Sequence, residues 1–108
     1  MSYDIHITRA NHWTESTKSP ISLDELKTIF AAKNDFEYSN TFSTSGPFKI
    51  SISGDFFIWK ADDALVPFRY FNGKLTVSGA DEGDVIDMMK GIASELNAKV
   101  QGDEGEVY

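Results

Sequence analysis

The dipeptide Asn72-Gly73 constrains the fold more than any other feature of this sequence. Both residues tolerate the positive φ angles of a two-residue turn, which joins antiparallel strands. Aromatic residues dominate 68–71 before it, while Leu75 and Val77 alternate with polar neighbours after it. The sequence therefore predicts a hairpin at this point and an antiparallel sheet as the framework of the chain.

Other strands are expected where apolar and polar residues alternate or where β-prone residues gather. These segments are 3–9, 37–42, 48–53, 56–59 and 99–101. Gly54-Asp55 is expected to be a turn that leads into the apolar run 56–59. Residues 106–108 are expected to pair with 99–101 across the turn 102–105.

Two helices are expected. Ser22 and Glu25 have the spacing of a capping box, which predicts a helix over about 23–33. Asp81 is the expected cap of a second helix over about 82–97, whose apolar line consists of Val85, Met89, Ile92 and Leu96. The fold class is therefore α+β, as a single domain over 1–108. We expect a mostly antiparallel sheet of about 5–7 strands with both helices packed on one face, in the order β-α-β-β-β-β-α-β.

The run 56–59 is apolar on both faces of its strand, whereas two helices can cover only one face of the sheet. We expect the irregular segment 10–21, anchored by Trp13, to cover the other face as a small second core. The alternative is an exposed aromatic patch that includes Trp59 and Phe71. Such a patch has the composition expected at the centre of a protein interface.

Negative charge is concentrated in the last 28 residues, which carry eight acidic side chains against two lysines, so −6 of the formal −7 lies there. Such a field repels nucleic acid and favours a basic partner.

On the second helix, Asp84, Asp87 and Glu95 share a sector opposite the apolar line, with Gly91 between them. Glycine inside a helix costs about 1 kcal/mol relative to alanine, which suggests a packing reason for its presence. Asp84, Asp87 and Glu95 are therefore candidate partner-binding residues. The turn before the last residue adds three more: Asp103, Glu104 and Glu106.

No motif of catalysis or cofactor binding is visible. The chain has no cysteine, and His6 and His12, which are expected at the surface, lack the spacing of a zinc site. No serine elbow, glycine-rich phosphate loop or EF-hand loop is present. The sequence also shows no secretory signal and no membrane-spanning run. We therefore expect a cytoplasmic, non-enzymatic protein with no cofactor and no metal.

Two segments of the sequence, one near each end, are distinctive. Residues 3–26 read YDIHITRANHWTES…PISLDEL, and residues 98–108 read AKVQGDEGEVY. Together they cover about a third of the chain and resemble a group of small bacterial proteins that largely lack an assigned activity. In size, acidity and lack of catalytic motifs, the chain also resembles the immunity proteins of bacterial toxin–immunity systems, including contact-dependent inhibition. This second resemblance is one of type, so it assigns no role to any residue.

These features predict a binding protein, with an immunity protein that neutralises a basic, nucleic-acid-acting toxin domain as the leading interpretation. The acidic protein would neutralise the toxin by covering the basic surface with which the toxin holds phosphates. Two alternatives stay open. One is a small-ligand-binding protein or enzyme with a pocket near His6, Arg9 and His12, and the other is a structural or regulatory protein that self-associates. The oligomeric state is left open as well.

Overall fold

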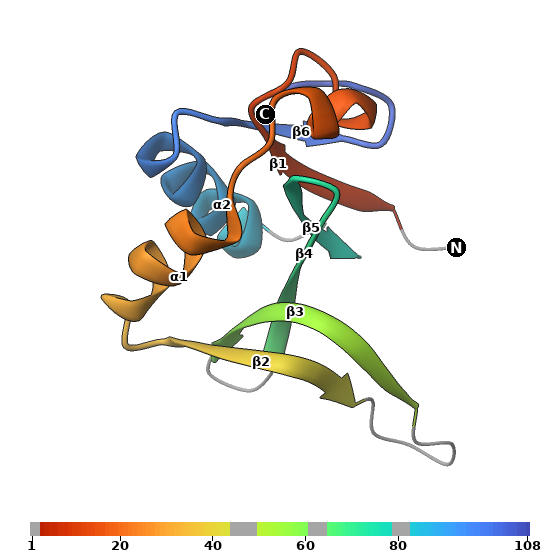
Figure 1. The fold of residues 1–108 in the computed structure, drawn as a ribbon. Coiled ribbons are helices and arrows are strands. Elements are labelled where there is room, and N and C mark those ends of the chain that lie inside the picture. The colour runs from red at the N-terminus through yellow and green to blue at the C-terminus, as the bar shows by residue number, and fades with distance from the viewer. Residues whose placement is uncertain (1–2, 44–49, 61–64, 79–82) are drawn as a thin grey trace.

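The computed structural model describes residues 3–43, 50–60, 65–78 and 83–108. Within these ranges, six strands and two α-helices follow one another, with one additional 3-10 helix, η1 (Figure 1). In order the elements are β1 (Asp4–Thr8), η1 (Trp13–Lys18), α1 (Leu23–Ala31), β2 (Phe36–Ser43), β3 (Ser51–Lys60), β4 (Leu65–Phe71), β5 (Lys74–Ser78), α2 (Gly83–Glu95) and β6 (Lys99–Gly102).

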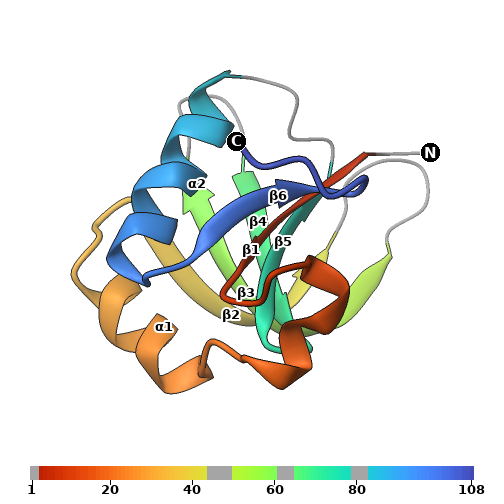
Figure 2. The same cartoon turned by 90° about the horizontal axis from the view of Figure 1, so that it is seen from above.

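The strands form one antiparallel sheet in the order β2-β3-β4-β5-β1-β6. Strand β1 is therefore interior although it comes first in the sequence, with Ile5 opposite Val77 on one side and Gly102 on the other. Figures 1 and 2 place α1 and α2 on the same side of this sheet. The α+β class and the order of strands and α-helices predicted from the sequence are confirmed.

The Asn72-Gly73 hairpin is confirmed, with φ of 51° at Asn72 and 79° at Gly73. Glycine is also required here by space. A Cβ on Gly73 would stand 2.8 Å from both the Pro20 Cβ and the Ser16 carbonyl oxygen. The turn between β4 and β5 thus lies directly against the segment that leads from η1 to α1.

The turn expected at Gly54-Asp55 is wrong, because β3 continues through both residues. In the pairing with β2, Ser39 faces Phe56 and Thr41 faces Ser53, so two residues of β3 oppose the single Asn40. Such an insertion is a β-bulge, which bends a strand without ending it. The glycine signal therefore marks a bulge, and the curvature of β3 is visible in Figure 1. Part of the expected strand 48–53 lies outside the described residues.

The predicted capping box is present at α1. The Ser22 hydroxyl accepts from the Glu25 amide at 3.2 Å, and Glu25 accepts from the Ser22 amide at 3.0 Å. The cap expected at Asp81 lies outside the described residues. At the C-terminal end of the molecule, Gln101 pairs with Val107 in an antiparallel bridge, so the expected pairing across the turn 102–105 is confirmed.

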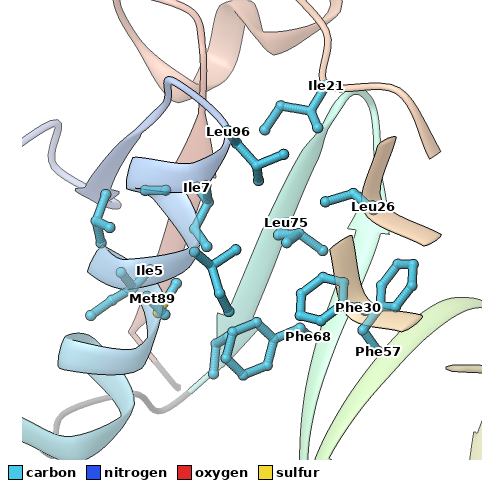
Figure 3. Packing of buried hydrophobic residues seen from close by; sticks show 14 of the residues in the cluster. Ile5, Ile7, Ile21, Leu26, Phe30, Phe57, Phe68, Leu75, Met89 and Leu96 are labelled. Carbon is cyan, nitrogen blue, oxygen red and sulfur yellow. The ribbon is translucent and has the colours of Figure 1, made fainter. Parts of the chain in front are cut away.

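The main core lies between the sheet and the two helices (Figure 3). It brings together side chains from the two helices and the inner face of the strands, with Ile21 from the segment before α1. Figure 3 labels Ile5, Ile7, Ile21, Leu26, Phe30, Phe57, Phe68, Leu75, Met89 and Leu96. Aromatic stacking contributes where α1 meets the sheet, because the ring centroids of Phe30 and Phe57 are 4.5 Å apart.

The apolar run in β3 is covered differently from the expectation. Phe57 belongs to the helix-covered core, whereas Phe56 and Ile58 point to the opposite face. The Phe42 ring and the Arg69 guanidinium lie 5.8 and 5.9 Å from Phe56, which is 3% exposed. The segment 10–21 does not cover this strand. It covers β1 and β5 instead.

Because the segment 10–21 packs over β1, the prediction that His6 is at the surface is wrong. Trp13 stacks on the His6 ring with a centroid distance of 4.3 Å, and His6 is 3% exposed. The polar side of β1 is thus enclosed by η1 rather than solvated. Its alternating sequence pattern could not reveal this, because a polar strand face looks the same whether water or hydrogen-bonding protein covers it.

Candidate functional site

Four of the residues singled out on the sequence line a single groove of about 490 Å³ between α2, Trp59 and the segment after α1. Asp84, Asp87 and Glu95 contribute from α2, as the helical spacing predicted. Trp59 contributes from β3. Met88 and Ile92 supply apolar surface to the same groove, and Lys33 lines it as well.

The charge of the groove is negative. Three carboxylates face one cation, Lys33, whose ammonium is 2.7 Å from the Glu95 carboxylate. Asp84 and Asp87 are exposed, and neither forms a salt bridge with another described residue. The groove can therefore accept positive charge at Asp84 and Asp87, while Glu95 is held by Lys33.

Gly91 lies on the groove side of α2 and leaves it open. A Cβ at this position would have no heavy atom within 4 Å. The packing of the described chain therefore gives no reason for a glycine here, although glycine costs about 1 kcal/mol inside a helix. Because glycine has no side chain, the groove is wider at this position between Asp87 and Glu95.

Trp59 provides the aromatic surface of the groove. Its indole nitrogen donates to the Asp35 carboxylate at 3.2 Å, and its ring stacks on Phe36 with a centroid distance of 6.5 Å. These contacts fix the orientation of a half-buried ring. Phe71, the other aromatic candidate, lies on the opposite face of the sheet beside Lys74. The two rings do not form the single exposed patch that was the alternative expectation.

The acids of the C-terminal turn lie at another site and mostly serve the fold. Asp103 accepts from the Asp4 amide at 2.9 Å and lies 2.8 Å from His6 Nε2. Burial opposes ionisation of Asp103, but these two hydrogen bonds prevail and lower its pKa. The Tyr3 hydroxyl donates to the Glu106 carboxylate, which lowers the pKa of Glu106 and raises that of Tyr3 to about 12.

Glu104 is exposed, and its amide donates to the Tyr3 hydroxyl at 3.2 Å. No side-chain hydrogen bond or ion pair is recorded for it among the described residues. Of the three acids in this turn, Glu104 alone presents a carboxylate without such a role. The sequence pattern located the turn correctly but could not separate the structural acids from this one.

The structure does not gather His6, Arg9 and His12 into one pocket. Arg9 binds Glu25 through two hydrogen bonds of 2.7 and 3.0 Å and donates to the Leu96 carbonyl at 2.8 Å. This pairing holds the pKa of the Glu25 carboxyl at about 2. His12 caps η1 by accepting from the Thr14 amide. Within the described residues, His6 and Arg9 line two different pockets, and neither pocket includes His12.

The pocket lined by His6 lies on the η1 side of the sheet, has a volume of about 340 Å³ and also includes Lys74, Thr76 and Trp13. Sequence reasoning missed Lys74 because a lysine on an alternating strand normally faces water. It also missed Lys33, the counter-ion in the acidic groove. The only signal for Lys74 was its position next to the Asn72-Gly73 turn, against which the 10–21 segment packs.

Among the described residues, no group of three or more histidine, aspartate and glutamate side chains is arranged to hold a metal ion. Within the same ranges, neither helix has the length and apolar character needed to cross a bilayer. Comparison of the chain with protein-family models, curated proteins and solved structures found no match. The site must therefore be interpreted from its own chemistry.

Proposed function

We propose that this chain is a non-enzymatic binding protein whose acidic groove receives basic side chains of a protein partner. One observation carries the proposal. The acids expected from the helical spacing, Asp84 and Asp87, line the same groove as Trp59. Carboxylates beside an aromatic ring suit a lysine or arginine side chain, whose charge pairs with the acids and whose stem or guanidinium packs on the ring.

The biological role that fits this chemistry is that of an immunity protein. A toxin domain that acts on nucleic acid needs a basic surface to hold phosphates. An acidic protein can cover such a surface, and opposite fields accelerate the encounter of the two proteins. The groove is then the place where cations of the toxin would be held. Neutralisation of a toxin inside the producing cell would require a cytoplasmic location.

The groove can be tested with a hexa-arginine peptide at low ionic strength, with affinity measured by calorimetry. Neutralising Asp84 and Asp87 together, as D84N/D87N, should weaken binding. A pair of unit charges 4 Å apart in water contributes about 1 kcal/mol, or roughly fivefold per acid. The matched control D24N/E37Q removes the same charge from exposed positions outside the groove and should bind nearly as well as the wild type.

Equal losses in both double variants would contradict the groove, because they would show that only the net charge matters. The immunity role needs a separate test. The chain should form a tight, salt-sensitive complex with a cationic toxin domain encoded beside its gene. If it elutes alone with every such domain, the immunity role is wrong, whatever the peptide result.

A further inference from the structure

Lys74 is the most unusual charged residue of the described chain. It starts β5 and is 4% exposed. No hydrogen bond or ion pair to its ammonium is recorded among the described residues. Its Nζ atom lies 4.0 Å from the centroid of the Phe71 ring and 5.8 Å from that of Trp13. Burial of the side chain lowers the pKa of Lys74. No side-chain nitrogen or oxygen of the described residues is both fully buried and without a hydrogen-bond partner, so the unpaired ammonium itself reaches the pocket.

The polar groups next to Lys74 are occupied elsewhere. His6 Nδ1 lies 2.9 Å from the Thr76 hydroxyl and His6 Nε2 lies 2.8 Å from Asp103 Oδ1. Burial lowers the pKa of His6 and so favours the neutral imidazole. A neutral His6 that donates from Nε2 to the Asp103 carboxylate accepts from the Thr76 hydroxyl at Nδ1. This chain of hydrogen bonds is closed, so His6, Thr76 and Asp103 pair with one another and not with the Lys74 ammonium.

The remaining lining of the pocket suits a small organic molecule. Trp13 and Phe71 supply aromatic surface, and the exposed side chains of Thr14, Thr17 and Asn72 lie at the same pocket. A volume of about 340 Å³ lies at the small end of the range found for ligand pockets. Most of the lining comes from η1 and from the β4–β5 hairpin, which Gly73 allows to approach closely.

We propose that this pocket binds a small molecule with a single carboxylate and an aromatic or apolar body, with the carboxylate paired to the Lys74 ammonium. The body would lie against Trp13 and Phe71. Two carboxylates, Asp4 and Asp103, also line the pocket. They oppose ligands with several negative charges, so a monocarboxylate is favoured over a phosphate or a nucleotide.

The probe for this proposal is benzoate, with benzamide as its neutral counterpart of the same shape. The measurement is an NMR titration of the full chain in which the indole N–H of Trp13 is followed, its resonance assigned with W59F. Benzoate should shift this resonance saturably, whereas benzamide and inorganic phosphate should bind at least about tenfold more weakly. The loss of a hydrogen bond to a charged group accounts for a factor of this size.

The variant K74M keeps an unbranched side chain and removes the charge, so it should lose benzoate binding by about tenfold or more. The control K90M removes a lysine from the exposed face of α2 and should bind benzoate like the wild type. Equal binding of benzoate by K74M, equal binding of benzamide by the wild type, or no shift at Trp13 would each overturn the proposal. The comparison of the two probes on the wild type decides the question even if K74M does not fold.

Discussion

The two faces of the sheet are both buried around β1 and β5, but by opposite means. On the helix side, Ile5, Ile7 and Leu75 pack among other apolar side chains. On the η1 side, the buried residues are polar, and all of them except Lys74 are held by side-chain hydrogen bonds. These residues are His6, Thr8, Lys74, Thr76 and Gln101, together with Ser16 of η1. One strand thus separates an apolar interior from a polar one.

The two faces differ in the interactions that hold the helices and η1 against the sheet. The helices are held by apolar contacts, which have no preferred direction and tolerate some change of shape. η1 is held by specific pairs: the Thr8 and Ser16 hydroxyls are 2.7 Å apart, and Gln101 Oε1 accepts from the Trp13 amide at 2.7 Å. A buried polar group that loses its partner keeps its desolvation cost. The η1 side should therefore be sensitive to the loss of single partners.

The largest effect is expected on the apolar side. Phe57→Ala removes a fully buried ring between α1 and the sheet and should lower the free energy of unfolding by about 3–5 kcal/mol. Phe71→Ala, at a ring that is 38% exposed on the other face, should cost much less. Urea denaturation of both variants measures the difference. Similar losses would mean that the apolar core is not confined to the helix side.

A single hydrogen-bonding group should matter on the η1 side. Asp103→Ala leaves His6 Nε2 and the Asp4 amide without their partner and should cost about 1–3 kcal/mol of unfolding free energy. Its neighbour Glu104 is exposed, so Glu104→Ala should stay within about 0.5 kcal/mol. Thermal or urea unfolding distinguishes the two. A harmless Asp103→Ala would contradict the view that hydrogen bonds hold this face together.

Acidification should act on the same face. Because burial lowers the pKa of folded His6, the unfolded state binds a proton more readily, and stability rises with pH. The contribution is complete above the unfolded value of about 6.5 and declines as the pH falls from there toward the lowered folded value. The slope is at most about 1.4 kcal/mol per pH unit for one proton.

The variant that tests this is His6→Asn, which removes the titrating imidazole. His6→Asn should flatten the dependence of unfolding free energy on pH below about 6.5. A pH dependence that is unchanged in His6→Asn would contradict the assignment to His6. Asp103 adds a loss only at much lower pH, since its folded pKa lies below the ordinary value of 3.8.

The smallest effect is expected at the acidic groove. Gly91→Ala should raise stability by up to about 1 kcal/mol, because the methyl group meets nothing and the helix gains propensity. The same methyl group narrows the groove and should weaken binding of the hexa-arginine peptide. Ser94→Ala, on an exposed position of α2 outside the groove lining, is the control that should leave peptide binding unchanged. Destabilisation by Gly91→Ala would show that glycine is needed for the fold itself.

Local patterns predicted the parts of the molecule that depend on neighbours in the sequence. The capping box at Ser22, the turn at Asn72-Gly73 and the acid sector of α2 follow from spacings of a few residues. The burial of His6 and Lys74 depends on η1 folding back over strands that come from distant parts of the chain. Gly54 correctly indicated an irregularity in the strand pattern. Only the pairing of β3 with β2 shows that this irregularity is a β-bulge and not a turn.

The place of β1 in the sheet has a consequence for the kinetics of folding. β4 and β5 can pair through a two-residue turn, which closes quickly. β1 instead obtains both its neighbours, β5 and β6, from the distant second half of the chain, so each pairing requires closure of a long loop. We expect refolding to begin around the β4–β5 hairpin and to be limited by the insertion of β1. Substitutions in β1 should then speed unfolding, while those in the hairpin should slow refolding.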